Sequence, residues 1–596
     1  MYISSASLNQ IPGNISFNKQ NILSAINTAK LAGSKFLCLP ELCITAYDCQ
    51  DMFYSDELIV SAKECLFELV SETKGITVTL GLPLYVDGKL YNAVAVVSDG
   101  VLLGFTCKSV LANDGIHYEA RWFKEWPLDK QSYVSISDNK FEVSNKIYNT
   151  FGINFIVEIC RDAWVEDRVL LDVLDDVDLV LNSSASHFAL GKRQNKIESI
   201  FYPLKDKKLV YVYANQLGNI AGNAIYAGDT IIFQNGRVVV DGNRFSYKDY
   251  SIITEEVDFS QELSNSSEDA LLGFKLEDDY TEFTKAVSLG LFDYLRKTAA
   301  KSFALSLSGG MDSSTCACLV YSMYQLALKE LGKDGLKQKL GIDSMQDLLH
   351  SMYQKSSFSS EATYLAANKL SEYLGASFYA WDVDNVVDEY LSVSENFIGR
   401  KLTWEQDNLA LQNIQARARA PSIWLLANLY NAVVLVTSNR SEITLGYNTQ
   451  DGDTAGGLAP IAGVSKQFIK KYLNHFETNS IAGISPVKAL SFVNANPPSA
   501  ELKDKQLDEE DLMPYNLVEK LERLVVLQKL PKAEVIEILS RDSLGNISKK
   551  EIVLYVDKFF KLLKKNQWKR ERAALSFMLD DFSMDAKTWF RYPVIN

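Results

Sequence analysis

Three residues of complementary chemistry stand near the ends of predicted strands in the first half of the chain. Glu41 lies in the string PEL, Lys108 in TCK and Cys160 in EICRD. A thiolate can attack an amide carbon while a carboxylate takes and returns protons, and an ammonium group can stabilise the oxyanion that forms. Together these residues predict hydrolysis of an amide. For reaction at neutral pH we expect the pKa of the thiol to lie below its free value of about 8.5.

A second set of residues, in the string SLSGGMDSS (306–314), predicts a phosphate site. A strand runs into two glycines, which permit a tight turn, and Asp312 and Ser313 then open a helix. Backbone amide groups at the start of a helix bind anions, and the Asp312 carboxylate could hold Mg²⁺ beside a phosphate. The chain contains neither GxxxxGK[S/T] nor GxGxxG, which excludes a Walker-type ATPase and a standard dinucleotide-binding fold.

The first half alternates strand-like runs with helical segments, and these elements must position the first three residues. Two hairpins are predicted to turn at Asp99-Gly100 and Asn235-Gly236, which are residue pairs that tight turns prefer. Such alternation with hairpins predicts a sheet sandwich with helices outside. The predicted strands and hairpins cover residues 36–40, 76–83, 93–108, 154–160, 178–186, 208–216 and 230–240.

A polar stretch at residues 258–283 separates the two halves and has the composition of a linker. After it, a helix is predicted over 285–300, and buried strands over 302–310 and 433–439. Strand–helix alternation to about residue 470 predicts a doubly wound parallel sheet. The tail from about residue 499 is charged and mostly helical.

The composition is that of a folded globular protein, with 47% hydrophobic and 23% charged residues among 596, enough for at least two domains. The net charge of -14 argues against broad binding to nucleic acid or to anionic membranes. We expect no membrane span and no signal peptide. The eight cysteines form no CxxC pair, which favours reduced thiols and a cytoplasmic protein. The four histidines lack metal-ligand spacing, and His117 is interpreted as a pocket or core residue.

Residues 1–255 resemble the nitrilase (carbon–nitrogen hydrolase) superfamily, in the strings around the three residues named first and in GLP at 81–83. The resemblance implies an αββα sandwich domain at 1–257 and an active glutaminase, with Glu41, Lys108 and Cys160 as its catalytic residues. The glutamine-binding residues that it implies are Asp114, Glu119, Ser186 and Lys192. Two positions depart from the family pattern: Arg161 stands where Glu is commoner, and Asp114 stands where Tyr is usual.

The loop at 306–314 resembles the SGGxDS loop of ATP enzymes that release pyrophosphate. Within that superfamily, four further strings resemble the glutamine-dependent NAD synthetases: 402–419, 436–467, PPSAEL (497–502) and Lys569-Arg570. The resemblance implies a linker at 258–284 and, at 285–596, a doubly wound parallel-sheet synthetase domain of the adenine nucleotide α-hydrolase-like (PP-loop) class with a C-terminal helical tail.

The same resemblance implies binding residues for each substrate. Those for ATP are Ser306, Leu307, Ser308, Gly309, Gly310, Met311, Asp312, Ser313, Thr437 and Lys466. Those for deamido-NAD are Asn413, Arg417, Glu442, Asp453 and Lys569. Asp312 and Glu442 would hold Mg²⁺. Lys466 lies in GVSKQ, which departs from the more usual Asp-Leu-x-Lys-Thr.

A nitrilase-like half followed by an NAD-synthetase-like half implies a ligase that forms a carbon–nitrogen bond. Glutamine would be hydrolysed at Cys160, and its ammonia would pass through an internal tunnel. ATP would adenylate deamido-NAD and release diphosphate, and ammonia would then displace AMP to leave NAD. The implied partners are these small molecules, without nucleic acid or membrane, in a homo-oligomer.

Two alternatives stay open at this point. The first is an ammonia-only NAD synthetase whose nitrilase-like half is an inactive scaffold; the intact Glu41, Lys108 and Cys160 argue against it, and Asp114 argues for it. The second is another adenylating amidotransferase, or a thiolase that modifies nucleic acid. The string from Asn413 to Arg417 and the acidic net charge argue against this second alternative.

Overall fold

The structure, a computed structural model, describes residues 1–595 except 137–138, 167, 262–272, 497–501, 503–511 and 542–546. The string PPSAEL (497–502) therefore lies, but for its last residue, outside the described residues. Packing divides the chain into an N-terminal unit, Met1–Asp279, and a C-terminal unit, Tyr280–Asn596. Within the described ranges, no helix is both long enough and apolar enough to cross a membrane.

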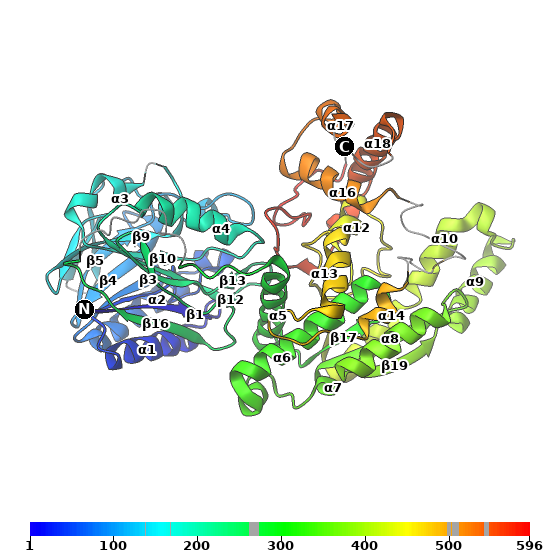
Figure 1. Cartoon of the computed structure of the whole chain (residues 1–596), viewed down its shortest axis with the longest axis horizontal. Coiled ribbons are helices and arrows are strands. Elements are labelled where there is room, and N and C mark those ends of the chain that lie inside the picture. Colours follow the sequence, from blue (N-terminus) through cyan, green and yellow to red (C-terminus); the bar gives the residue numbers. More distant parts are fainter. Residues whose placement is uncertain are drawn as a thin grey trace. The chain divides into compact units, whose positions relative to one another are not determined.

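The N-terminal unit is built on two packed β-sheets (Figure 1). An eight-stranded sheet has the order β16-β1-β2-β3-β4-β5-β7-β6, and a six-stranded sheet has the order β15-β14-β11-β10-β9-β8. Strands of the first sheet are β1 (Tyr2–Leu8), β2 (Phe36–Cys38), β3 (Thr77–Val86), β4 (Lys89–Ser98), β5 (Val101–Cys107), β6 (Ser132–Ile136), β7 (Asn139–Val143) and β16 (Tyr250–Glu256). Those of the second are β8 (Tyr148–Thr150), β9 (Ile153–Ile159), β10 (Leu179–Ser184), β11 (Val210–Asn215), β14 (Thr230–Gln234) and β15 (Arg237–Asp241).

Apolar layers lie between the two sheets of this unit and on the outer face of each. The middle layer lies between the sheets and includes Phe36 and Val94 from one sheet, and Phe155 and Leu179 from the other. The outer face of the first sheet packs against α1 (Ile15–Leu31) and α2 (Asp56–Val70). The outer face of the second packs against the π-helical turn Ile197–Phe201, which continues α4 (Lys192–Lys196). The αββα sandwich is therefore confirmed.

Both predicted hairpins are confirmed. β4 and β5 pair antiparallel about Asp99-Gly100, and β14 and β15 pair about Asn235-Gly236. The φ angles are 51° and 80° in the first turn and 50° and 81° in the second. Two consecutive positive φ angles match the right-handed twist of the flanking strands, which explains why Asp-Gly and Asn-Gly occupy these positions.

The C-terminal unit contains a parallel sheet with the strand order β19-β18-β17-β20-β21-β22 (Figure 1). The order reverses between β17 and β20, so the loops that follow these two strands meet at one edge of the sheet, where ligands bind in open α/β sheets. The strands are β17 (Ser302–Ser306), β18 (Leu349–Lys355), β19 (Ser377–Asp382), β20 (Ala432–Leu435), β21 (Leu458–Ala459) and β22 (Leu575–Ser576).

Helices flank this sheet and form the charged tail. They are α5 (Asp279–Lys297), α6 (Met311–Leu340), α7 (Met345–Leu348), α8 (Glu361–Leu374), α9 (Asp384–Ile398), α10 (Trp404–Arg417), α11 (Ala420–Tyr430), α12 (Arg440–Leu445), α13 (Lys466–Thr478), α14 (Leu490–Asn494), α16 (Tyr515–Glu522), α17 (Lys532–Arg541), α18 (Lys549–Lys565) and α19 (Gln567–Arg570). α16, α17 and α18 share an apolar core with α12 through residues such as Leu517, Leu539, Phe559 and Ile443.

The segment between the halves differs from the simple polar linker that its composition predicts. α5 begins at Asp279, before the predicted helix start at 285. Ahead of it, Phe274 packs in the outer apolar layer of the N-terminal unit, and Lys275 N–H donates to Asp241 Oδ2 at 2.8 Å. Burial of the Phe274 side chain holds this segment against the N-terminal unit, although the residues around it are polar.

Candidate active sites

The three residues Glu41, Lys108 and Cys160 follow the ends of β2, β5 and β9, which belong to both sheets of the sandwich. Lys108 Nζ lies 2.6 Å from Glu41 Oε1 and 2.7 Å from Glu119 Oε1. Glu41 and Lys108 are fully buried, and Cys160 is 7% exposed. The sandwich thus brings a thiol, an ammonium group and two carboxylates together away from bulk water.

Glu41 keeps one carboxylate oxygen unpaired. Oε1 accepts hydrogen bonds from Lys108 Nζ and from Asn92 Nδ2, the latter at 2.6 Å. Oε2 is buried and accepts no hydrogen bond within the described part of the chain. An unsatisfied buried carboxylate oxygen is costly, and here it is free to take a proton. Sequence reasoning missed Asn92, which lies inside β4 without any motif to mark it.

The pKa of the Cys160 thiol shifts opposite to the sequence-based prediction. Burial and the negative charge of Glu41 raise this pKa to about 12, although Lys108 acts against them. Burial also raises the pKa of Glu41 to about 7. Without substrate the thiol is therefore neutral, and it needs a base to take its proton as it attacks. Cys160 also has a φ of 47°, a left-handed backbone conformation that is uncommon for a residue with a side chain.

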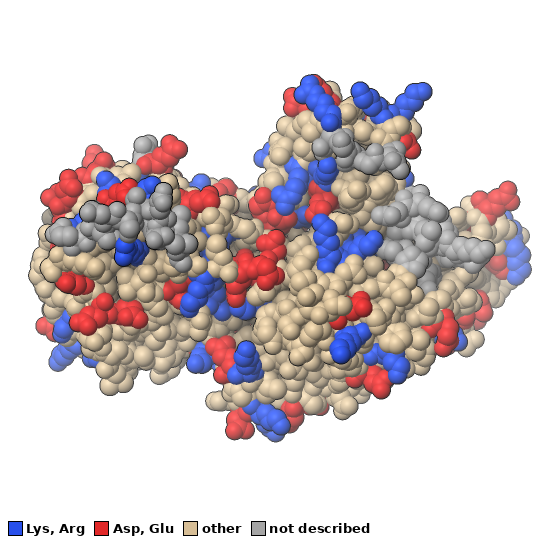
Figure 2. All heavy atoms as spheres, in the orientation of Figure 1, with Lys and Arg blue, Asp and Glu red and all other residues tan. Residues whose placement is uncertain are grey.

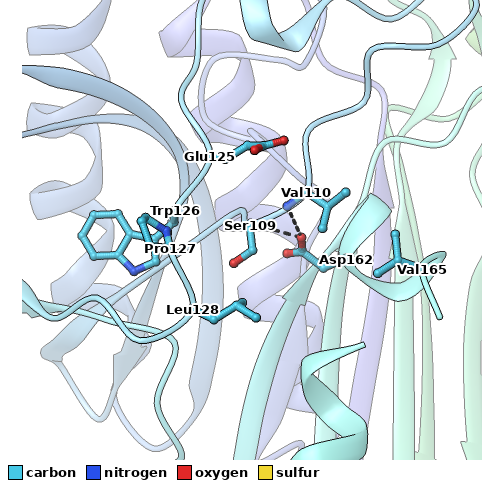
Figure 3. A pocket seen from close by; sticks show the side chains of 8 residues that line it. All are labelled: Ser109, Val110, Glu125, Trp126, Pro127, Leu128, Asp162 and Val165. Atoms are coloured by element: carbon cyan, nitrogen blue, oxygen red, sulfur yellow. Dashed lines mark hydrogen bonds between the residues drawn. The ribbon is translucent and has the colours of Figure 1, made fainter. Parts of the chain in front are cut away.

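Asp162 ties the turn that carries Cys160 to the segment after Lys108 (Figure 3). Its Oδ1 accepts from the backbone N–H groups of Ser109 at 3.1 Å and of Val110 at 2.8 Å. A cavity of about 390 Å³ opens beside this contact and is lined by Ser109, Val110, Glu125, Trp126, Pro127, Leu128, Asp162 and Val165. Burial raises the pKa of Asp162 to about 7. This carboxylate holds the segments that carry Lys108 and Cys160 next to each other.

The four predicted glutamine-binding residues differ in their burial and in their distance from the catalytic candidates. Glu119 is 2% exposed and contacts Lys108 directly. Ser186 is held through its backbone, since Asn215 Oδ1 accepts from its N–H at 2.8 Å. Lys192 begins α4 and lies 3.1 Å from His187 Nδ1.

The remaining contact, Asp114, is exposed, and its Oδ2 accepts from Arg161 Nη1 at 2.8 Å. The two departures from the nitrilase pattern therefore form one ion pair beside Cys160. That pairing is invisible in the sequence, because the partners stand far apart along the chain.

The predicted phosphate loop lies at the end of β17, where the sheet order reverses. Gly309 has a φ of 79°, and a Cβ there would lie 2.2 Å from the carbonyl oxygen of Thr363, so glycine is required. α6 begins at Met311. Thr437 follows β20 on the neighbouring loop. This is the arrangement that presents backbone amide groups to an anion.

Asp312 and Glu442 share one cation in the structure. Lys466 Nζ contacts Asp312 Oδ2 and lies 3.4 Å from Glu442 Oε1. Asn439 Nδ2 donates to Asp312 Oδ1 at 3.0 Å, a contact that sequence reasoning missed. No cluster of three or more His, Cys, Asp or Glu side chains suitable for a metal occurs among the described residues. Two carboxylates beside a phosphate loop nevertheless fit Mg²⁺, which takes one or two carboxylates plus phosphate oxygens.

Four predicted deamido-NAD contacts converge on the loop 446–454. Asn413 Oδ1 accepts from Thr449 Oγ1 at 2.9 Å, and Arg417 Nε donates to Gln450 O at 3.0 Å. Lys569 Nζ donates to Gly446 O at 2.7 Å and to Asn448 O at 2.6 Å. Asp453 Oδ1 accepts from Thr449 N–H at 2.6 Å, and burial raises the pKa of this carboxyl to about 6.

A small cavity beside this loop is lined by residues that include Ser438, Asn448, Gln450, Thr454 and Lys569. Glu442, the fifth predicted contact, lies instead with Asp312 and Lys466. Residues from the loop and from α19 thus line one cavity, and α10 contacts the same loop, although the sequence separates these elements widely.

Comparison with family models and known proteins follows the division into two units. A model described as carbon-nitrogen hydrolase matches residues 3–262, and one described as NAD synthase matches residues 283–573. The glutamine-dependent NAD(+) synthetase of Oryza sativa subsp. indica is 29% identical over 98% of this chain and 89% of its own length. That of Aquifex aeolicus is 28% identical over 99% of this chain and 98% of its own length.

Solved structures give the same result over the whole chain. A crystal structure of a glutamine-dependent NAD(+) synthetase from Cytophaga hutchinsonii has a TM-score of 0.89 at 39% identity, covering 100% of this chain and 98% of that one. The enzyme from Acinetobacter baumannii in complex with ADP has a TM-score of 0.68 at 22% identity, covering 100% and 99%, and shows the shared fold. The chain belongs to the family of glutamine-dependent NAD(+) synthetases.

Proposed function

We propose that the N-terminal unit hydrolyses glutamine and that the C-terminal unit uses the released ammonia to amidate deamido-NAD with ATP. The single observation that carries the proposal is the buried set in the N-terminal unit. Cys160 follows β9 with a strained backbone, Lys108 contacts Glu41, and Glu41 keeps Oε2 unpaired. A scaffold without catalysis would have no reason to retain an unsatisfied buried carboxylate oxygen.

In the first reaction, Glu41 takes the proton of the Cys160 thiol as the sulfur attacks the glutamine amide carbon. Lys108 stabilises the oxyanion that forms. Glu41 returns the proton to the leaving nitrogen, so that ammonia departs and a thioester remains. Water, activated in turn by Glu41, then releases glutamate and restores the thiol. Asp114, Glu119, Ser186 and Lys192 would bind the glutamine.

In the second reaction, a carboxylate oxygen of deamido-NAD attacks the α-phosphorus of ATP, and diphosphate leaves. Ammonia then attacks the adenylated carbonyl carbon, AMP departs and NAD remains. The loop from Ser306 to Ser313 would hold the phosphates, with Thr437 and Lys466 beside it. Asn413, Arg417, Glu442, Asp453 and Lys569 would hold deamido-NAD.

Asp312 and Glu442 would hold Mg²⁺, which supplies positive charge to the phosphates when it is bound. The support is that these two carboxylates already share a cation, the ammonium group of Lys466. An internal passage would carry ammonia between the two reactions, because a free amine released to solvent would be protonated and lost as a nucleophile.

A homo-oligomer in the cytoplasm is part of the proposal. α9 and α11 expose large apolar side chains, among them Phe397 at 80% and Leu429 at 71%, and clustered exposed apolar groups mark interaction surfaces. All eight cysteines are free thiols, as is usual in a reducing compartment. On the face drawn in Figure 2, acidic and basic side chains are interspersed, in keeping with a protein that binds neither nucleic acid nor membrane.

Product analysis tests the proposal. The chain is incubated with Mg²⁺, ATP and deamido-NAD, and with either glutamine or an ammonium salt. We expect NAD, AMP and diphosphate from both nitrogen sources, with glutamate only from glutamine. Formation of ADP and phosphate would refute adenylation. NAD synthesis from the ammonium salt without any NAD synthesis from glutamine would establish the ammonia-only alternative.

A further inference from the structure

Two histidines that the reaction above does not use form a continuous hydrogen-bonded chain with the buried catalytic groups. His187 Nδ1 lies 2.8 Å from His117 Nε2, and His117 Nδ1 lies 3.2 Å from Tyr47 Oη. Tyr47 Oη donates to Glu119 Oε1 at 2.5 Å, and Glu119 contacts Lys108. The chain therefore joins the catalytic centre to a pair of imidazoles.

The other end of this chain reaches the edge of the site. Lys192 Nζ lies 3.1 Å from His187 Nδ1 and 3.3 Å from His187 Nε2, so it stands over the imidazole ring and not on the lone pair of either nitrogen, and the chain ends at His187. His117, His187 and Lys192 are all partly exposed, whereas Tyr47 and Glu119 are buried. One end of the chain is therefore accessible to water, and the other end is sealed.

The heavy-atom positions fit two arrangements of the protons. When Glu119 is ionised, Tyr47 donates to it, so His117 must donate through Nδ1 and accept at Nε2 from His187 Nδ1–H. His187 Nε2 then accepts from water. When Glu119 is protonated, every one of these hydrogen bonds is reversed, and His187 Nε2–H donates to water. The second arrangement turns into the first when each group passes one proton outward.

Glutamine hydrolysis creates a need for such a path. Water and the amide give ammonia, the glutamate carboxylate and one proton. If that proton stayed in the buried site it would convert ammonia to ammonium, which has no lone pair for the next reaction. Glu41 receives the proton first. Lys108 can accept it from Glu41 while giving one of its own to Glu119, and so remains an ammonium group throughout.

We propose that His117 and His187, together with Tyr47 and Glu119, relay the proton released by glutamine hydrolysis from the buried centre to solvent. This inference rests on the proposed glutaminase activity. One proton leaves Glu119, one passes from His187 Nε2 to water, and both histidines stay neutral. Tautomer exchange at the two histidines then resets the chain.

The electrostatics of the site suit these roles. Burial and the nearby cations Lys192 and Lys108 lower the pKa of His117 to about 3, and burial with Lys192 also lowers that of His187. Both rings are therefore neutral and can donate and accept at once. Burial and Lys196 lower the pKa of Lys192 to about 7.

Three other groups face these residues. Asp114 favours the charged form of Lys192, and Arg161 disfavours it. The thiol group of Cys160, when ionised, also favours it. These groups set the charge on Lys192, which stands beside the outer end of the chain.

The test replaces each histidine by a residue that keeps hydrogen bonds but cannot pass a proton. In His117→Gln and His187→Gln, the amide still donates and accepts. His475→Gln, on α13 of the C-terminal unit, is the matched control. The readout is glutamate formed from saturating glutamine with ATP and deamido-NAD, at low and at high concentrations of imidazole buffer. Synthesis from ammonium salts is measured in parallel.

We expect the relay variants to lose about ten- to hundred-fold of the glutaminase rate in dilute buffer, within the range of proton-transfer contributions. Imidazole should restore much of this loss, whereas the wild type and the control stay independent of the buffer. Synthesis from ammonium should be unchanged in every variant. A relay variant with the wild-type rate, or a loss that imidazole does not restore, would overturn the relay. Absence of glutamine hydrolysis in the wild type would instead refute the proposed function.

Discussion

Both units place a lysine between two carboxylates, and the two arrangements differ in their access to water. In the N-terminal unit, Lys108 lies between Glu41 and Glu119, whose side chains are 0% and 3% exposed. In the C-terminal unit, Lys466 lies between Asp312 and Glu442, whose side chains are 17% and 14% exposed. The same three charges thus occur once in a sealed setting and once in an open one.

The difference in burial suits the two sets to different chemistry. Removal from water penalises charge, and this raises the pKa of Glu41 to about 7, which suits a group that takes and returns protons. Asp312 and Glu442 keep contact with solvent beside the phosphate loop, which suits carboxylates that exchange one cation for another. A lysine–carboxylate set can therefore serve acid–base catalysis or cation binding, and burial decides which.

Removing the sulfur should have the largest effect and should separate the two units. Cys160→Ala abolishes the covalent path, so synthesis of NAD from glutamine should fall by about three orders of magnitude or more. Synthesis from ammonium salts should persist, because the C-terminal site is untouched. NAD formation is measured with each nitrogen source, and Cys65→Ala, on the buried face of α2, is the control. A Cys160→Ala chain that still uses glutamine would show that another group is the nucleophile.

A change in the solvent-accessible set of the C-terminal unit should impair NAD synthesis and spare glutamine hydrolysis. Asp312→Ala removes a carboxylate that would hold Mg²⁺, so synthesis should fall about 10²-fold or more with either nitrogen source. Glutamine hydrolysis should continue. Both rates are measured over a series of Mg²⁺ concentrations, with Asp334→Ala, on the later part of α6, as the control. Equal Mg²⁺ dependence of the Asp312→Ala and wild-type chains would remove Asp312 from the metal site.

Replacing Lys569 should weaken the binding of deamido-NAD at the C-terminal site. Lys569→Ala removes an ammonium group beside the loop 446–454 and should raise the KM for deamido-NAD about ten-fold, the effect of one charge-assisted contact. Glutaminase activity should stay intact. Initial rates at limiting deamido-NAD give the comparison, and Lys565→Ala, exposed at the end of α18, is its matched control. Unchanged synthesis at limiting deamido-NAD would contradict the assignment.

The smallest expected effect is a shift in the pH dependence of glutaminase activity when a contact of Glu41 in the buried set is removed. Glu41 must be ionised to take the thiol proton, and its pKa is raised to about 7, so glutaminase kcat/KM should fall as the pH drops below neutrality. Asn92→Leu removes a donor to this carboxylate, which raises the pKa further and moves the acidic limb to higher pH. At pH 7 the rate should fall about two- to ten-fold. Asn149→Leu, on an exposed strand end, is the control; a profile that Asn92→Leu leaves unmoved would exclude Glu41 as the base.

The sequence alone was sufficient for the fold class of each half and for naming the candidate catalytic groups. Local preferences of the backbone determine the strand-length apolar runs, the Asp-Gly and Asn-Gly turns and the glycine pair after β17. These features can therefore be predicted from the sequence without knowledge of distant contacts. The order of a nitrilase-like half and a synthetase-like half led to the family. Glu41, Lys108 and Cys160 could be selected because each stands at the end of a recognisable strand.

Only the tertiary structure decided what those groups experience. The pKa of Cys160 rises rather than falls because burial and a neighbouring carboxylate outweigh Lys108, a balance that depends on distances and exposure. The pairing of Asp114 with Arg161, the contact of Asn92 with Glu41 and the chain through His117 and His187 likewise join residues far apart in sequence. Residue types reveal which chemistry is available, but electrostatic energies depend on three-dimensional separation and on access to water, and these exist only in the folded chain.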